Sequence, residues 1–152
     1  MVKSYRGVLQ EKPKTPQTAV TVADYMSKKL ITFRPEQYMD EVIETLLKYR
    51  ISGGPVVNDR GELVGVISEG DCMKEVVRGK YNNMPNLSGT VSDHMTTDVV
   101  SILPETNIFD AAKLFLEQRI RRFPVVSMGK IMGQISQKDV MRAVHRMKSA
   151  TW

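Results

Sequence analysis

A tandem repeat constrains the fold of this chain most, because a segment that begins at Val22 recurs from Val91. The first parts of the two copies align with an offset of 69 residues and the second parts with an offset of 68, so one residue is lost in a turn. Chance does not easily produce so many identities in order, so we expect each copy to fold as one supersecondary unit. The identities include Asp24 and Asp93, Met26 and Met95, Pro55 and Pro124, Gly65 and Gly133, Ser68 and Ser136, and Asp71 and Asp139.

Each copy contains the same order of predicted elements. A short β-prone run, at 30–33 or 99–102, is stopped by a proline, and an amphipathic helix follows. A Pro-Val-Val strand and a second strand then form a hairpin that leads into a final helix. The sequence therefore predicts two β-α-β-β-α units of the α+β (α/β) class. We expect an N-terminal arm at 1–21, a first repeat at 22–78, a linker at 79–90 and a second repeat at 91–148.

Units of this size cannot bury a sheet well on their own. We therefore expect the two units to pack sheet against sheet, with pseudo-twofold symmetry, as one compact module. In each first helix, apolar residues recur at the spacing of a helix that is buried on one side. The predicted buried faces are Met39, Val42, Ile43, Leu46 and Leu47 in the first repeat, and Ile108, Ala111, Ala112, Phe115 and Leu116 in the second. Thr106 is the predicted N-cap of the second of these helices.

The Ser-x-x-Asp sequence at the start of each final helix has two interpretations. Ser68 with Asp71, and Ser136 with Asp139, have the form of capping boxes, which serve only to start a helix. Alternatively, the free N–H groups and positive dipole end of the helix attract a phosphate, while the serine and aspartate bind phosphate or ribose oxygens. Duplication copies caps as readily as binding sites, so both interpretations stay open on the residues alone.

The composition excludes several classes of protein. No apolar run approaches the ~20 residues that cross a bilayer, and residues 1–6 have no signal-peptide core behind them. The single cysteine, Cys72, excludes an internal disulfide and indicates a reducing, cytoplasmic location. No catalytic triad, phosphate-binding P-loop or set of metal ligands is present, so we expect neither an enzyme nor a metal site. The net charge of +5 is compatible with solvated faces or with an anionic partner.

The ordered motifs together resemble the CBS domain, named after cystathionine β-synthase. They are Asp-x-Met, an amphipathic helix, Pro-Val-Val and Gly-x-Ile-Ser-x-x-Asp, and the resemblance covers residues 22–147. It implies a tandem CBS pair, often called a Bateman module, that is stand-alone and commonly forms a homodimer. Such modules commonly bind adenosine ligands, such as AMP, ADP, ATP, S-adenosylmethionine or NAD, in crevices between the two units. They regulate an attached or partner protein and are not themselves catalytic.

The resemblance also implies site residues. Asp71 and Asp139 match the ribose-binding acid of the family, and the two serines match its hydroxyl for phosphate or ribose. Before Pro-Val-Val the second repeat has Arg121-Arg122-Phe123, whereas the first has Ser52-Gly53-Gly54. Paired guanidinium groups suit phosphate, although they also occur as solvated charge clusters. The full predicted nucleotide site is Thr32, Ser52, Val56, Ser68, Asp71, Ser101, Arg121, Arg122, Val125, Ser136, Lys138 and Asp139, with the two valines as apolar walls for a purine.

The sequence therefore predicts a ligand-sensing regulatory module that binds an adenine nucleotide as its regulatory ligand and signals to a separate partner protein. If one site is occupied, we expect it to be the one that contains Arg121, Arg122, Ser136 and Asp139. An alternative is an interaction or dimerisation scaffold that binds no ligand. A basic nucleic-acid-binding protein is a further alternative, but the chain lacks a recognisable recognition helix or interleaved aromatic residues on a basic sheet.

Overall fold

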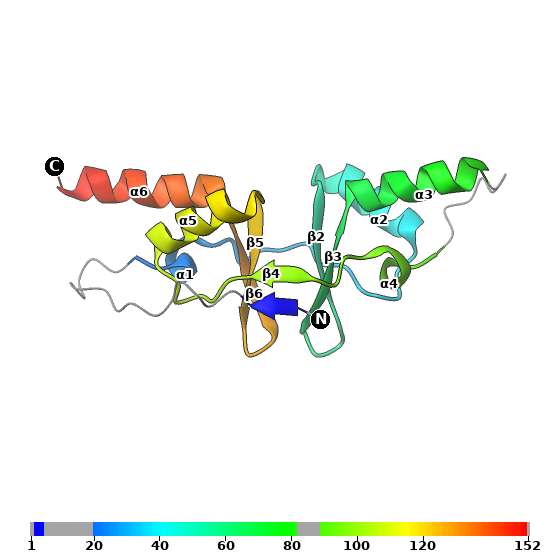
Figure 1. Ribbon diagram of the computed structural model, residues 1–152, viewed down its shortest axis with the longest axis horizontal. Coiled ribbons are helices and arrows are strands. Elements are labelled where there is room, and N and C mark those ends of the chain that lie inside the picture. The colour runs from blue at the N-terminus through cyan, green and yellow to red at the C-terminus, as the bar shows by residue number, and fades with distance from the viewer. Residues whose placement is uncertain (1, 5–19, 82–88, 152) are drawn as a thin grey trace. The chain divides into compact units, whose positions relative to one another are not determined.

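The computed structural model describes residues 2–4, 20–81 and 89–151, whose helices and strands are labelled in Figure 1. The hairpins and the helices follow the repeat in the sequence. The elements are β1 (Val2–Ser4), α1 (Val22–Tyr25), α2 (Met39–Tyr49), β2 (Gly53–Val57), β3 (Leu63–Ser68), α3 (Glu69–Tyr81), α4 (Val91–His94), β4 (Val99–Ser101), α5 (Ile108–Gln118), β5 (Arg122–Ser127), β6 (Lys130–Ser136) and α6 (Gln137–Thr151).

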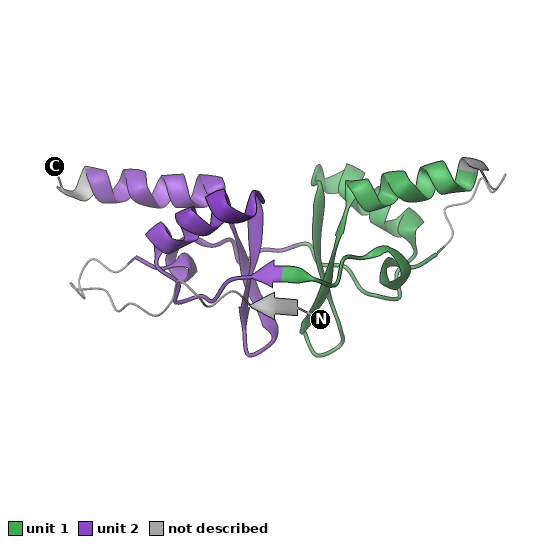
Figure 2. Ribbon diagram, viewed as in Figure 1, with its two compact units in different colours: residues 1–2, 31–99 green, residues 3–30, 100–152 purple. Residues whose placement is uncertain are grey.

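Two compact units divide the described chain, and their boundaries differ from those of the sequence repeats. Unit 1 contains residues 31–81 and 89–99, and unit 2 contains residues 20–30 and 100–151 (Figure 2). Helix α1, from the first repeat, therefore belongs to unit 2, and helix α4, from the second repeat, belongs to unit 1. The two repeats thus exchange their opening segments, which the pattern of identities did not predict.

In unit 1 the strands β2 and β3 form an antiparallel hairpin in which Gly53 lies opposite Ser68. Backbone bridges extend this hairpin on both sides: Phe33 pairs in parallel with Val56, and Thr96 pairs antiparallel with Val66. The β-prone run at 30–33 thus supplies one bridge and not a full strand. The segment that covers the outer edge of β3 comes from the second repeat.

Unit 2 repeats this arrangement with β5 and β6, in which Arg122 lies opposite Ser136. Ile102 pairs in parallel with Val125, and Ser27 pairs antiparallel with Gln134. The run at 99–102 forms β4, which also pairs with β1. The strand at β1 was not predicted, because three residues with one apolar side chain carry no periodic signal. Of the predicted N-terminal arm, residues 5–19 lie outside the described residues.

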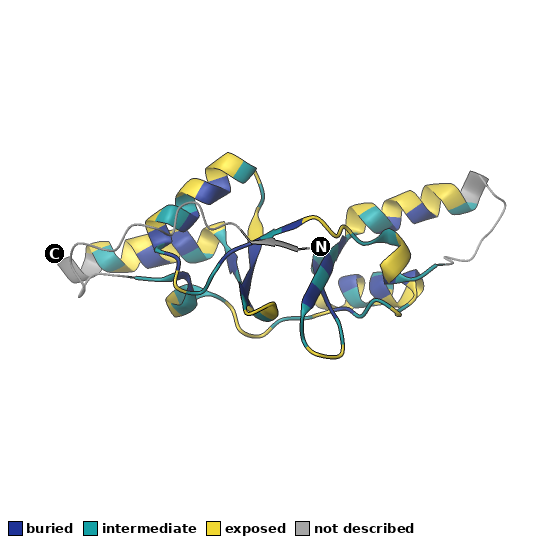
Figure 3. Ribbon diagram, turned by 60° about the horizontal axis from the view of Figure 1, so that its bottom comes forward, coloured by how far each residue is buried: buried dark blue, intermediate teal, exposed yellow. Residues whose placement is uncertain are grey.

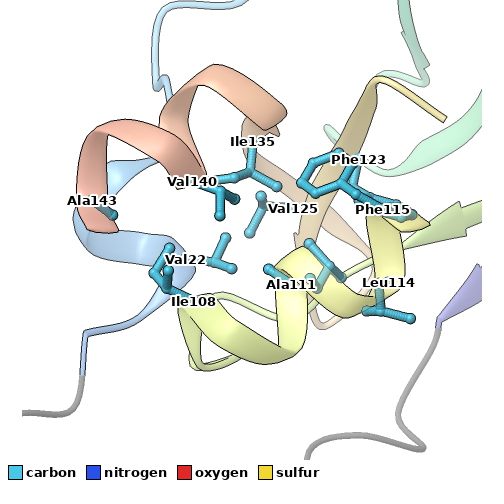
Figure 4. Close-up of a cluster of buried hydrophobic side chains, with 11 residues drawn as sticks. Val22, Ile108, Ala111, Leu114, Phe115, Phe123, Val125, Ile135, Val140 and Ala143 are labelled. Atoms are coloured by element: carbon cyan, nitrogen blue, oxygen red, sulfur yellow. The ribbon is translucent and has the colours of Figure 1, made fainter. Parts of the chain in front are cut away.

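Each unit has its own apolar core, and the core of unit 2 is drawn in Figure 4. Side chains from α1, α5, α6, β5 and β6 point toward one another there, and Phe115 and Phe123 pack with ring centroids 4.7 Å apart. Unit 1 buries the corresponding residues of α2, α3, α4 and its hairpin. The α+β class is confirmed, whereas the packing of sheet against sheet stays a prediction.

The structure corrects the predicted helix faces at one matched position. Leu47 is 75% exposed and Leu116 is 80% exposed, and Leu114 is buried. In α2 the i, i+3 and i+7 positions, Met39, Val42 and Leu46, face the core. Leu47 is the next residue after Leu46, so its side chain points about 100° around the helix from that of Leu46. Figure 3 shows buried and exposed residues alternating around these helices.

The predicted helix start and ends also need correction. Helix α5 is capped by Asn107, whose Oδ1 accepts a hydrogen bond of 2.8 Å from the Phe109 N–H. The cap is the residue directly before the first helical position, so Thr106 lies one residue too early and is buried instead. The last helices of the repeats continue to Tyr81 and Thr151, past the predicted ends at Arg78 and about Lys148.

Candidate functional site

Each hairpin runs directly into the helix that carries the Ser-x-x-Asp sequence. In unit 1 the Ser68 backbone N–H and hydroxyl both donate to Asp71 Oδ2, at 2.8 and 3.0 Å. In unit 2 the Ser136 N–H and hydroxyl donate to Asp139 Oδ2 at 2.8 and 2.9 Å, and the Asp139 N–H donates to Ser136 Oγ at 3.2 Å. Both serines therefore contact their aspartates as in a capping box, and in unit 2 the reciprocal bond to the serine hydroxyl is present as well.

The same geometry occurs at two places that the sequence analysis missed. The Thr21 N–H donates to Asp24 Oδ2 at 2.9 Å, and the Thr90 N–H donates to Asp93 Oδ2 at 3.0 Å. The hydrogen bond from the Thr90 N–H, and then that from its hydroxyl, lowers the pKa of the Asp93 carboxyl. The signal was present in the sequence as a Thr-x-x-Asp pair with the repeat offset. A capping box therefore does not by itself mark a ligand site in this chain.

The two candidate ribose acids differ in their second carboxylate oxygen. In unit 2, Arg142 Nη1 lies 2.9 Å from Asp139 Oδ1, so both oxygens of Asp139 have partners. Lys74 occupies the matching position in unit 1, but in the part of the chain that the structure describes the second oxygen of Asp71 accepts no hydrogen bond. A ribose hydroxyl would thus meet a free acceptor in unit 1 and a shared one in unit 2.

The residues before the Pro-Val-Val strands lie beside these helix starts. In unit 1 the Glu69 N–H donates to the Ser52 carbonyl at 2.9 Å, and in unit 2 the Gln137 N–H donates to the Arg121 carbonyl at 3.4 Å. The register of the second hairpin places Arg122 opposite Ser136. The structure therefore places Ser52 beside the helix start of unit 1, and Arg121 and Arg122 beside that of unit 2.

The charge near the two helix starts differs strongly. Arg121, Arg122 and Lys138 are all exposed at the start of α6. The matching loop of unit 1 contains glycines that are held by packing: a Cβ on Gly53 would lie 2.5 Å from the Ile67 carbonyl oxygen, and one on Gly54 would lie 2.8 Å from that of Ile31. These glycines allow close approach of backbones. Only unit 2 presents a cationic loop at this position.

Not all predicted site residues are accessible. Val56 and Val125 are fully buried in the cores of their units, so the prediction that they form apolar walls for a purine is not supported by their placement. Burial does not alternate along these strands, because consecutive residues are buried from Gly54 to Val57 and from Phe123 to Val126. Ser101 is also buried, at 1% exposure, whereas Thr32 is exposed.

The surroundings of Cys72 disfavour a reactive thiolate. Burial, and then the nearby Asp71 and Glu69 carboxylates, raise the pKa of the Cys72 thiol, which disfavours the nucleophilic thiolate. Among the described residues, no group of three or more His, Cys, Asp or Glu side chains could hold a metal ion. No helix in that part of the chain is long and apolar enough to cross a membrane.

Comparisons with known proteins agree on the family. The family model described as CBS domain matches residues 22–78 and 91–146. Protein MJ1225 of Methanocaldococcus jannaschii is 31% identical over 121 residues, which are 80% of this chain and 41% of that protein. The chain thus spans less than half the length of this relative.

Two solved structures are similar as well. The structure of CBSX2, a protein of Arabidopsis thaliana, in complex with AMP is 33% identical and has a TM-score of 0.73; the match covers 84% of this chain and 98% of the chain in that structure. The CBS domain pair of MJ0100, in complex with 5′-methylthioadenosine and S-adenosyl-L-methionine, is 25% identical with a TM-score of 0.69. That match covers 85% of this chain and 98% of the other.

Proposed function

The chain belongs to the CBS-domain family, and on that premise we propose that it is a regulatory module that binds an adenine nucleotide such as AMP, ADP or ATP. The observation that carries this proposal is the loop of unit 2, where Arg121 and Arg122 adjoin Ser136 at the start of α6. Guanidinium groups, a hydroxyl and the N–H groups of a helix start are the donors that phosphate prefers. The complex of CBSX2 with AMP supports the choice of ligand.

Within this proposal each residue has a distinct role. Arg121, Arg122 and Lys138 neutralise phosphate charge, and the Ser136 hydroxyl donates to a phosphate or ribose oxygen. Asp139 accepts hydrogen bonds from ribose hydroxyls. For this, Arg142 has to move away from Asp139 Oδ1. Ser68 and Asp71 form the corresponding ribose site of unit 1, with Ser52 and Thr32 nearby, and it lacks cations.

The regulatory role follows as a population shift. A ligand that binds one conformation of the module more tightly raises the fraction of that conformation, and a partner protein that prefers it then binds more. We propose a separate protein as the regulated partner and no catalytic role for this chain. The cytoplasmic location expected from the single cysteine stays a prediction, since CBSX2 is chloroplastic.

The proposal is tested by isothermal titration calorimetry with AMP, ADP, ATP and adenosine. We expect Arg121→Ala/Arg122→Ala to weaken AMP binding about 100-fold or more, because each of the two charge-assisted hydrogen bonds contributes roughly 1.5–3 kcal/mol. Adenosine binding should change little, since it has no phosphate. Lys113→Ala/Arg146→Ala is the matched control, because it removes the same charge from exposed positions elsewhere on unit 2.

The outcomes separate the candidate functions. Equal AMP affinity in the arginine variant and in the control would contradict the assigned phosphate site. A wild-type chain that binds none of the four ligands, and whose melting temperature none of them raises, would favour the interaction scaffold instead.

A further inference from the structure

The opening segments of the two repeats are nearly interchangeable, yet each belongs to a different unit. Residues 21–27 read Thr-Val-Ala-Asp-Tyr-Met-Ser, and residues 90–96 read Thr-Val-Ser-Asp-His-Met-Thr. Both contain a capping box followed by one short helix, with almost the same backbone angles at both caps. Because the two segments and the two units are so similar, either segment could in principle dock on either unit.

Most contacts of these segments are shared and cannot decide between the units. Val22 and Val91 are both fully buried. A Cβ on Gly133 would lie 2.8 Å from Met26 Sδ, and one on Gly65 would lie 2.7 Å from Met95 Sδ, so the methionines pack on the glycines in the same way. The backbone bridges to β6 and β3 are also equivalent.

One pair of contacting positions has ionisable side chains that face each other in unit 1 but an alanine and a tyrosine in unit 2. In unit 1, His94 Nε2 of α4 lies 3.1 Å from Glu75 Oε2 of α3, and the Glu75 side chain is only 4% exposed. Although the two atoms are this close, they are not aligned as a hydrogen bond. The matching residues in unit 2 are Tyr25 and Ala143; Ala143 is fully buried and Tyr25 packs against the same core.

The other charged groups near Glu75 do not replace the histidine. Arg78 Nη1 lies 3.8 Å from Glu75 Oε2, but its side chain is 67% exposed. Asp93 is next to His94 and is held by its own capping box with Thr90. The position of a Cβ on Gly89 would be 2.8 Å from His94 Nε2, so the chain before α4 closes over the imidazole. His94 is therefore the partner of Glu75 that is itself mostly buried, at 14% exposure.

We propose that the Glu75–His94 pair selects which opening segment docks on which unit. With the segments crossed, Glu75 would face an uncharged phenol ring and His94 would face the methyl group of Ala143. Each of these two contacts would leave Glu75 or His94 buried without a suitable partner, which is strongly unfavourable. The pair thus destabilises the crossed docking more than it stabilises the observed one. This holds whether the crossed docking would occur within one chain or between two copies of it.

A double-mutant cycle tests whether the two residues are coupled. The variants are Glu75→Ala, His94→Tyr and Glu75→Ala/His94→Tyr, of which the last copies the Ala–Tyr pair of unit 2. We expect His94→Tyr alone to lower the folding equilibrium constant roughly tenfold or more, because Glu75 stays buried without its partner. The double variant should recover most of that loss. Losses that simply multiply in the double variant would overturn the proposal.

A cross-linking experiment separates selection from simple stabilisation. Val66 and Thr96 exchange both backbone hydrogen bonds, at 2.9 Å each, which places their Cα atoms about 5.5 Å apart and within reach of a disulfide. Val66→Cys/Thr96→Cys therefore reports the observed docking, and Val66→Cys/Ser27→Cys reports the crossed docking. Native Cys72 is buried and serves as an internal background.

Both reporters are then placed in Tyr25→His/His94→Tyr, which exchanges only the two deciding residues between the segments. We expect the yield of the observed cross-link to fall severalfold and the crossed cross-link to rise, as a monomer or as a disulfide-linked dimer. In the wild-type background the crossed reporter should stay reduced. An exchange variant that keeps the wild-type pattern of cross-links would overturn selection, even if the cycle shows coupling.

Discussion

At the scale of single residues, the same hydrogen bond between a hydroxyl residue and an aspartate occurs four times among the described residues. Ser68, Ser136, Thr21 and Thr90 each donate to the aspartate three residues later, with nearly the same distances. The boxes at Asp24 and Asp93 start helices of four residues, and those at Asp71 and Asp139 start the long helices beside the candidate ligand loops. What distinguishes a candidate binding site is therefore the surroundings of the carboxylate and not its cap.

The repeated box provides a matched control for a prediction about ribose binding. Asp139→Ala removes a cap, worth ~1 kcal/mol, and also the proposed ribose acceptor, so we expect both lower stability and at least tenfold weaker AMP binding. Asp93→Ala removes a cap of the same geometry without touching a candidate loop, so only stability should fall. Calorimetry with AMP, combined with thermal unfolding, measures both effects.

Asp71→Ala completes this comparison between the units. The cationic loop predicts that Asp139→Ala weakens AMP binding more than Asp71→Ala does. Asp71, however, has the carboxylate oxygen that no described group occupies, whereas Arg142 competes for that of Asp139. Lost affinity in Asp71→Ala with none lost in Asp139→Ala would show that the free acceptor outweighs the arginines.

The sequence predicted the Ser–Asp contacts of the helix starts better than the exposure of the other candidate residues. Ser68, Asp71, Ser136 and Asp139 could be found because a fixed spacing along one helix start determines their contact. The burial of Val56 depends instead on the residues that cover the hairpin, and these are distant in the sequence. The Glu75–His94 contact was also beyond prediction, since neither residue has a like counterpart in the other repeat.

At the scale of elements, two glycines explain how the exchanged segments fit. A Cβ on Gly65 would lie 2.9 Å from the Thr96 carbonyl oxygen, and one on Gly133 would lie 2.7 Å from that of Ser27. The Asp-x-Met motif supplies the other half of this contact: its aspartate closes the cap, and its methionine packs on the glycine. The two motifs that define each repeat thus meet across the exchange.

Gly65→Ala and Gly133→Ala are therefore predicted to destabilise the fold. The clash is with backbone oxygens as well as a flexible methionine, so repacking cannot relieve it, and we expect each variant to cost about 1–3 kcal/mol in the free energy of unfolding. Gly70→Ala in α3 is the control, because its nearest contact would be Ser68 Oγ at 3.5 Å and alanine favours a helix. Urea unfolding should show no loss for Gly70→Ala; a similar loss in all three variants would contradict the packing argument.

The order of elements was predictable, and the exchange of segments was not. Proline stops, 3.6-residue periodicity and the hairpin pattern each act over a few neighbouring residues, so the sequence carried them directly. A repeat is symmetric under its own offset, so it predicts equal docking of α1 and α4 on either unit. The difference between Tyr25 and His94, seen against Ala143 and Glu75, breaks that symmetry.

At the scale of the whole molecule, both repeats leave an apolar stripe exposed on their last helix. Met73 and Val76 of α3 are 57% and 44% exposed, and the matching Met141 and Val144 of α6 are 62% and 39% exposed. Apolar side chains that gather at matched exposed positions are typical of association surfaces. We therefore expect α3 and α6 to form the contact between two copies of the chain in a homodimer.

Met73→Glu/Met141→Glu tests this expectation, because a carboxylate on each stripe would have to be buried without a partner in the dimer. Native mass spectrometry of the wild-type chain should give twice the 17.2 kDa mass of one chain, and the variant should shift to the single-chain mass. Met128→Glu changes a methionine that is 97% exposed in a hairpin turn, outside both stripes, so its mass should equal that of the wild type. A variant that stays dimeric would place the contact on another surface, such as that around the exposed Leu47 and Leu116.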